Sequence, residues 1–340
     1  MHILEKRLAI ERAEWAVPYP REFVFDYHEE EKAGTVINDG YEAGKLLNRI
    51  VLKNSKRIRT LLSRVWGQIR SEISSRDITS TRFSGEVEHE IESAYSNFVN
   101  NNLAPIWLKA ILSAAKYMKR EMGGTKSVSA EEILEGWEWS GGYAALREWI
   151  DTSAGSKITL FTQTEIESFR AALSIWMMQS PIPLIGSKDS ISGILKNTVG
   201  LLPRYQSAIA KYAANLAENG ASQATIERAI ARESRRLLKS RAETIARTEI
   251  STAWNQGIIE SVRAGVKDGD IIGEMYKRWS TGKDELVCEI CGPLDRQMRH
   301  IDDPFDSGDL MPPAHINCRC CVSFVSFIPG VDKDPPPRVN

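Results

Sequence analysis

Cys288-Glu-Ile-Cys291 and His315-Ile-Asn-Cys318-Arg-Cys320 are the stretches that decide how the last third of this 340-residue chain folds. They hold four of the five cysteines, and the fifth, Cys321, follows directly. Two cysteines separated by two residues can direct both sulfurs at one ion from a single turn, with thiolate as the ligand form. A His and a Cys three apart can complete the tetrahedron from a second turn. The spacing predicts a structural zinc site whose candidate ligands are Cys288, Cys291, His315, Cys318 and Cys320.

The five candidates compete for four places, and the spacing leaves open which one is excluded. A disulfide is the less favoured interpretation, because no secretory signal is evident and thiols stay reduced inside a cell. A catalytic zinc would keep one position open for water and seldom uses so many thiolates. Zinc deaminases need a His-x-Glu ahead of Pro-Cys-x-x-Cys, whereas Val287 precedes Cys288 and the only His-x-Glu begins at His28.

The same region carries a longer pattern in a specific order. It reads Arg241-Ala-Glu-Thr-Ile-Ala-Arg247-Thr248-Glu249, Trp254-Asn255-Gln-Gly257, Lys277-Arg-Trp279, Asp284, Cys288-x2-Cys291 and Pro312-Pro313-x-His315-x-Asn317-Cys318-Arg319-Cys320. This pattern, over about residues 201–329, resembles the Mu F-like head morphogenesis proteins of tailed phages. Ile316 stands where the family usually has a proline.

The resemblance implies a non-enzymatic minor head protein. It would be made in the host cytoplasm and lie in the virion, inside the capsid near the portal vertex. Its partners would be the portal protein and other head proteins, and some members of the family contact the packaged genome. Roles in head assembly, genome packaging or DNA ejection follow from the same resemblance.

Composition is that of an ordinary globular protein, with 42% hydrophobic and 26% charged residues and a net charge of -1. No apolar run approaches the roughly 20 residues needed to span a bilayer, and no lipidation or transit signal is evident. We therefore expect no membrane association.

The clearest helix is expected over 42–72, where apolar residues recur every three or four positions. Between them lie seven basic residues and no acidic one from Arg49 to Arg70. Such a face can attract DNA phosphates or an acidic protein surface. The alternative is a solvated face balanced by acids elsewhere. A second basic helix is expected over 228–247.

Further helices are expected over 83–122, with a break at Asn100–Asn102 and Pro105, and over 164–179, after a loop at 153–156. Ser129 and Glu132 form a capping box. Aromatic residues cluster near Trp137, and core packing is favoured for them over base stacking. Four aromatic residues between Tyr19 and Tyr27 would form an arm or a core plug.

Proline, glycine and serine enrichment places a linker or partner-contacting loop at 181–203, between a helical region over 1–180 and a zinc-containing domain over 204–329. In that domain we expect helices over 204–218, from Ser222 onward, and around Ile245 to Val262. Strands are expected over 271–279 and 318–327, and a flexible tail over 330–340. The expected fold is mainly α, ending in a small β element clamped by zinc, because two strands alone do not hold together in water.

Two other function classes fit the sequence less well. A metal-dependent hydrolase or nuclease would need a general base, and Glu249, Asp284 and Glu289 are the nearby candidates. The acidic stretch from Asp302 to Asp309 lacks the glycine and distal Glu of a calcium loop, which favours a solvated loop. A zinc-stapled DNA-binding regulator would show finger spacing, which is absent.

Overall fold

The computed structural model describes residues 35–75, 86–123, 142–178, 198–282 and 284–332. These residues are mainly helical and end in a small antiparallel sheet, which confirms the predicted fold class. None of the described helices is both long enough and apolar enough to cross a bilayer. The capping box at Ser129, the N-terminal aromatic group and, of the aromatic residues near Trp137, Trp137 and Trp139 lie outside the described residues. Tyr143 and Trp149 of that group lie in the helix Gly142–Met178, where Trp149 is half-buried.

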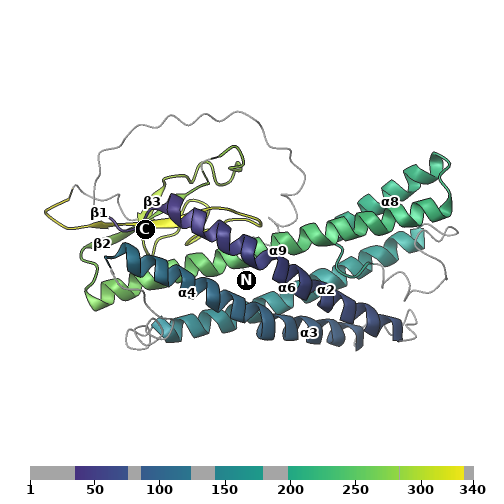
Figure 1. Ribbon diagram of the computed structural model, residues 1–340, viewed down its shortest axis with the longest axis horizontal. Coiled ribbons are helices and arrows are strands. Elements are labelled where there is room, and N and C mark those ends of the chain that lie inside the picture. Colours follow the sequence, from purple (N-terminus) through teal and green to yellow (C-terminus); the bar gives the residue numbers. More distant parts are fainter. Residues whose placement is uncertain (1–34, 76–85, 124–141, 179–197, 283, 333–340) are drawn as a thin grey trace. The chain divides into compact units, whose positions relative to one another are not determined.

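The chain divides into two compact units, and long helices contribute to both. One unit takes residues 1–54, 106–148 and 244–340, and the other takes residues 55–105 and 149–243. The domain boundaries expected from the sequence remain a prediction. Figure 1 labels the helices and the strands of the sheet.

Helix α2 (Gly40–Ser75) confirms the helix expected over 42–72. It forms because its apolar residues fall on one stripe, and that stripe is buried. Its buried residues include Leu47, Val51, Ile58, Leu62, Trp66 and Ile69.

The break expected near Pro105 is replaced by a wide helical turn. Helix α3 (Glu86–Phe98) continues through a π-helical turn, η1 (Val99–Leu103), into α4 (Ala104–Glu121). The amide of Ala104 donates to the carbonyl of Val99. A proline at position 105 lacks an N–H and crowds the preceding turn. The wider turn accommodates Pro105 without ending the helix.

Two other expected helix boundaries are wrong for a common reason. Helix α6 (Gly142–Met178) runs through the loop expected at 153–156. Helix α9 (Gln223–Asp268) is a single helix of 46 residues, where two were expected. Weak local propensity costs at most about 1 kcal/mol per residue, and burial of side chains such as Phe169 and Ile250 outweighs it. By contrast, α8 (Pro203–Glu218) starts with a proline and stops before Asn219-Gly220 as expected.

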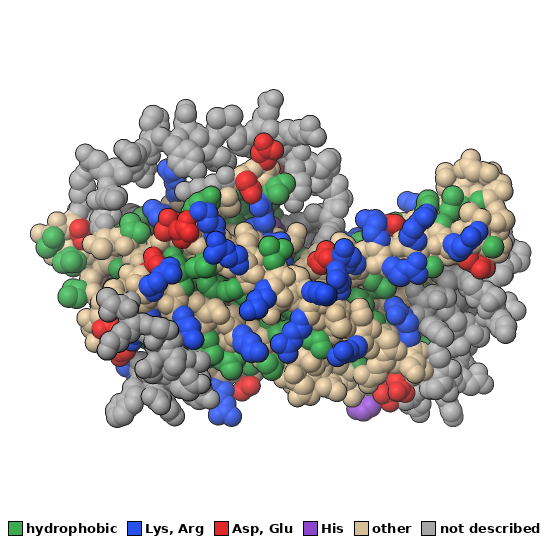
Figure 2. Space-filling model, in the orientation of Figure 1, with side chains coloured by type: hydrophobic (Ala, Val, Ile, Leu, Met, Phe, Trp, Pro, Cys, Tyr) green, Lys and Arg blue, Asp and Glu red, His purple; other side chains and the backbone are tan. Residues whose placement is uncertain are grey.

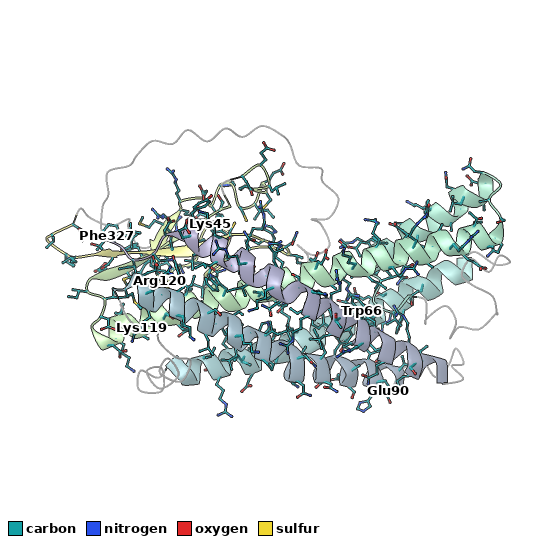
Figure 3. All side chains as sticks on the ribbon, in the orientation of Figure 1. Lys45, Trp66, Glu90, Lys119, Arg120 and Phe327 are labelled. Carbon is teal, nitrogen blue, oxygen red and sulfur yellow. The ribbon has the colours of Figure 1, made fainter. Side chains whose placement is uncertain are left out.

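The unit that contains residues 55–105 and 149–243 is organised around a buried charge. Glu165 accepts hydrogen bonds from the Tyr95 hydroxyl at 2.9 Å and the Gly200 amide at 2.6 Å. Arg241 lies 3.5 Å from Glu165 and donates to the Gly200 carbonyl at 2.7 Å. Trp66, labelled in Figure 3, donates to Tyr95. These contacts join four helices (α2, α3, α6 and α9) and the segment 198–202 through one satisfied polar network.

The β element is a four-stranded antiparallel sheet, larger than the two strands expected. Its order is β1 (Thr35–Val36), β4 (Cys321–Phe327), β2 (Glu274–Ser280) and β3 (Met298–His300). The two longer strands pair along their whole length, from Glu274 opposite Phe327 to Ser280 opposite Cys321. The other two strands are too short and too polar to be read from alternation.

Side-chain amides complete the outer edge of β4. The Asn38 amide oxygen accepts from the Phe324 N–H at 2.8 Å, and the Asn255 amide oxygen accepts from the Val322 N–H at 3.0 Å. Because β1 covers only the end of β4, these two amides satisfy donors that would otherwise be exposed at a sheet edge. Asn255 also anchors the sheet on α9.

Candidate metal centre

Two turns supply the predicted donors, and both are held by local hydrogen bonds. In the first turn the Gly292 amide donates to the Cys288 carbonyl at 2.9 Å, and the Cys291 amide donates to the Cys288 sulfur at 3.4 Å. In the second turn the Cys320 amide donates to the Cys318 sulfur at 3.5 Å. Asn317 takes a left-handed backbone conformation with φ of 62°, which asparagine tolerates better than most residues.

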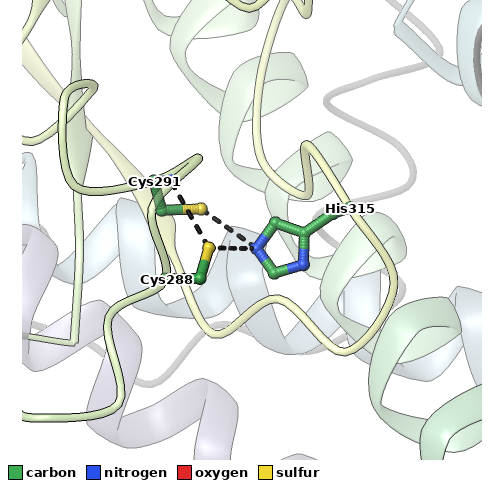
Figure 4. A group of neighbouring side chains, drawn as sticks. All are labelled: Cys288, Cys291 and His315. Atoms are coloured by element: carbon green, nitrogen blue, oxygen red, sulfur yellow. Dashed lines mark hydrogen bonds between the residues drawn. The ribbon is translucent and has the colours of Figure 1, made fainter. Parts of the chain in front are cut away.

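The structure brings the five predicted donors into two overlapping groups that could hold a metal ion. Cys288, Cys291 and His315 form one group, and Cys291, Cys318 and Cys320 form the other, with donor atoms within 4.8 Å inside each group. The His315 Nε2 lies 3.0 Å from the Cys288 sulfur and 3.1 Å from the Cys291 sulfur (Figure 4). The sulfurs of Cys291 and Cys318 are 3.7 Å apart.

The donor set fits a zinc ion. With Zn–S bonds of about 2.3 Å, a tetrahedral angle puts two sulfurs about 3.8 Å apart, close to the 3.7 Å between Cys291 and Cys318. The sulfur–nitrogen distances of 3.0 and 3.1 Å are shorter than the distance of about 3.6 Å that tetrahedral Zn–S and Zn–N bonds would give, so binding of the ion would move His315 slightly away from the two sulfurs. The His315 Nδ1 lies 2.8 Å from the Ile316 carbonyl, and donation there leaves the Nε2 lone pair directed at the sulfurs.

Protons are unevenly shared among the thiols. The pKa of Cys288 is lowered to about 4, mainly by its hydrogen bond with Cys291. Burial alone would raise this pKa, and the nearby His315 lowers it further. The pKa of Cys291 is raised, because its thiol bonds to Cys288 and Cys318 and is buried. Neighbouring thiolates repel one another, so a bound cation is what would allow all of them to ionise together.

An ion pair ties the two donor turns together. Arg319 donates to both carboxylate oxygens of Asp284, at 2.6 and 2.5 Å. Asp284 begins the first turn, where it also accepts from the Leu286 amide, and Arg319 lies between Cys318 and Cys320. The pairing preorganises the site through a bidentate geometry that only arginine offers.

A small apolar core lies against the donor turns. It consists of Trp279, Cys291, Leu294, Phe305, Ala314, Cys318 and Cys320. The rings of Trp279 and Phe305 meet edge to face with centroids 5.0 Å apart. This core buries Cys291, Cys318 and Cys320, leaves Cys288 half-buried, and fixes the turns on β2 through Trp279.

Cys321 lies outside both donor groups. It follows Cys320 at the start of β4, where successive side chains point to opposite faces. Its thiol is buried, and burial raises its pKa. Cys321 therefore belongs to the core of the sheet.

Comparison with known families gives one match. Residues 208–323 match the family described as Phage Mu protein F like protein. This region of the chain is Mu F-like. The match confirms the resemblance read from the sequence motifs, and it supports a phage head morphogenesis protein. Comparisons with curated proteins and with solved structures found no match.

The polar residues of the Mu F-like helix α9 hold the fold around the donor turns. Asn255 binds β4, as described, and the Thr248 hydroxyl accepts from the Asn317 amide at 2.9 Å. Arg247 donates to Asn48 of α2 at 3.0 Å. Asn255 thus ties α9 to the sheet beside the donor turns, whereas Arg247 ties α9 to α2.

The candidate general bases are placed as follows. Glu249 is buried on α9, Asp284 is held by Arg319, and Glu289 is exposed beside the first turn. In the acidic loop, Asp302 pairs with Arg263 and Asp306 with Arg299. These acids serve as ion-pair partners on the surface of the β element.

Sequence reasoning missed two features of the site. The first is the pair between Arg319 and Asp284, since both residues stood in the motif but nothing in their spacing linked them. The second is Lys277, a fully buried lysine of β2 that donates to the Ile301 carbonyl at 2.8 Å and lies over the Phe305 ring. The sequence did hint at its burial, because this lysine stands within the apolar pattern of the expected strand over 271–279.

Proposed function

We propose that this chain is a minor head protein of a tailed phage. It associates with the portal vertex inside the procapsid and acts in head assembly, genome packaging or ejection. Its partners are the portal protein and other head proteins, and it is present in the virion as a non-enzymatic component. The observation that carries the proposal is the Mu F-like match over residues 208–323.

The metal centre has a structural role in this proposal. One Zn²⁺ bound by donors from Cys288, Cys291, His315, Cys318 and Cys320 clamps the loops between β2 and β4. Catalytic zinc sites keep one coordination position open for water, whereas this set offers five donors, most of them thiols, within an apolar core. The arrangement therefore supports a clamp better than it supports a metal-dependent hydrolase.

The exposed face of α2 is the proposed contact for packaged DNA or an acidic head-protein surface. Arg49, Lys53, Lys56, Arg57 and Arg64 are exposed and form no ion pair with another described residue. Figure 2 shows Lys and Arg side chains along the part of the surface that α2 occupies in Figure 1. The stripe from 49 to 64 is about 22 Å long at 1.5 Å per residue, which is long enough for several phosphates.

The basic residues of α9 are less available for a partner. Arg236 pairs with Glu233, and Arg241 is buried against Glu165. Arg232, Arg235 and Lys239 remain exposed on that helix. Of the two basic helices expected from sequence, α2 is the better candidate.

Co-purification with the portal protein of the same phage tests the proposal. The two proteins are co-expressed, and the complex is captured through a tag on the portal at several salt concentrations. We expect a complex with a defined stoichiometry at physiological salt. Absence of a complex at every salt concentration tested, with both proteins folded, would contradict portal association.

DNA contact needs a separate assay with a matched control. We would compare Arg49→Gln/Lys53→Gln/Lys56→Gln/Arg57→Gln with Lys109→Gln/Lys116→Gln/Lys119→Gln/Arg120→Gln, which removes four exposed charges from α4. If α2 contacts duplex phosphates, its variant lowers the slope of log K against log salt by up to about 3.6, at about 0.9 per phosphate. Equal slopes for both variants would exclude α2 as the DNA contact.

A further inference from the structure

Five donors surround a centre that needs four, and the contacts distinguish among them. Every ligand atom of a tetrahedral ion lies close to the other three. The Cys288, Cys291 and His315 donors are mutually close, and Cys318 is joined to them through Cys291 at 3.7 Å. Cys318 and Cys320 both lie outside the group of Cys288, Cys291 and His315. The Cys318 sulfur contacts both Cys291 and His315, whereas the Cys320 sulfur contacts Cys291 and Cys318.

Backbone amides support the sulfurs of Cys288 and Cys318. Each of these sulfurs accepts an N–H, from Cys291 at 3.4 Å and from Cys320 at 3.5 Å. Hydrogen bonds of this kind favour the thiolate, which is the ligand form. Cys320 thus contributes its backbone N–H to the sulfur of its neighbour.

The Cys320 side chain is placed as part of the apolar core. It is 4% exposed and belongs to the cluster that contains Trp279 and Phe305. A free cysteine in such surroundings behaves as a small hydrophobic residue. Cys291 and Cys318 belong to the same cluster, so burial is compatible with either role, and it is the contact of the Cys318 sulfur with His315 that separates it from Cys320.

We infer that Cys288, Cys291, His315 and Cys318 ligate the ion and that Cys320 is a core residue which supports the site through its backbone amide. This assignment rests on the proposed zinc site and names its ligands. It makes the centre a three-sulfur, one-nitrogen site whose imidazole is fixed by the Ile316 carbonyl.

Zinc content and X-ray absorption at the zinc edge test the assignment on the full-length protein. We expect about one zinc per chain, with three sulfurs near 2.3 Å and one nitrogen near 2.0 Å. A four-sulfur shell would overturn the assignment, because it would replace His315 with Cys320. A wild-type protein without metal would instead overturn the proposed zinc site itself.

Substitutions distinguish the role of Cys320 from the roles of Cys288 and Cys318, whose sulfurs accept hydrogen bonds from backbone N–H groups. Cys320→Ala should keep its zinc with the same absorption spectrum. Cys288→Ala and Cys318→Ala should bind it more weakly by roughly 100-fold or more, since even changes outside the first shell cost about 10- to 100-fold. Loss of zinc from Cys320→Ala, with Cys288→Ala or Cys318→Ala retaining it, would overturn the assignment while leaving a zinc site in place.

A substitution of Cys320 can also fail by disturbing the core. Cys320→Val fills the same apolar space and offers no donor, so it should retain zinc if packing is the role of this side chain. Retention by Cys320→Ser but not by Cys320→Val would indicate that a donor atom is needed there, and would contradict the inference.

Discussion

Gly257 marks the place where α9 and α4 pack backbone against backbone. A Cβ added there would lie 2.7 Å from the Ile111 carbonyl oxygen, 2.8 Å from the Ile111 Cα and 3.0 Å from the Ala114 Cβ. Two of these three atoms belong to the backbone of α4. Gly257→Ala therefore requires one helix to shift, because no side chain can rotate away.

The expected cost follows from two opposing effects. Overpacking a close contact costs about 1–3 kcal/mol, whereas replacing a helical glycine with alanine gains about 1 kcal/mol. We expect Gly257→Ala to lower the free energy of unfolding by about 1 kcal/mol net. Gly44→Ala on α2 is the matched control, because a Cβ there meets nothing within 4 Å. The control should be more stable than wild type by about 0.5–1 kcal/mol.

Urea unfolding followed by circular dichroism measures both variants. With a slope near 2 kcal/mol per molar urea, the two midpoints should differ by about 1 M, at unchanged slope. If Gly257→Ala is as stable as Gly44→Ala, the close crossing of α4 and α9 is wrong.

Three further predictions concern a buried charge, a buried lysine and the metal. Glu165→Gln should destabilise the protein by about 3–5 kcal/mol, because it leaves Arg241 charged and buried. The control is Glu42→Gln, which breaks the exposed pair with Lys45 and should cost under about 1 kcal/mol. Equal losses of stability in urea unfolding would refute the buried network. Burial lowers the pKa of Lys277 to about 8, so between pH 8 and the unfolded pKa near 10.5 the unfolded chain binds more protons and the stability of the wild type rises with pH. Lys277→Met, which cannot titrate, should therefore lose its stability advantage over wild type in that window. A difference in unfolding free energy between the two proteins that stays constant from pH 7.5 to 9.5 would contradict this. Chelation of the metal under reducing conditions should raise hydrogen exchange in residues 284–328 and leave the Glu165 network protected, and uniform protection after chelation would exclude a metal clamp.

Much of the fold was predictable from hydrophobic periodicity. The buried stripe of α2 and the stop of α8 at Asn219-Gly220 follow from residue spacing and from known helix endings. Helix junctions were less predictable, because the serines and glycine at 153–156 weaken a helix only slightly and burial of neighbours such as Phe161 decides the outcome. The π turn before Pro105 was not predicted either, because a proline usually ends a helix and here a wider turn accommodates it.

The candidate site shows the same division. Sequence spacing brought five donors to one place, because ligands in short turns have limited reach. It could not rank them, since the distinction between Cys318 and Cys320 depends on sulfur separations and on which amide points at which sulfur. The Arg319–Asp284 pair and the short strands β1 and β3 depend on contacts between segments far apart in the chain.

The most direct test of the account is the zinc content of the purified, reduced protein, measured by mass spectrometry of the metal without added zinc. The account predicts about one zinc per chain, lost in Cys288→Ser together with the ordered structure of residues 284–328. A well-folded, reduced sample without zinc would contradict it.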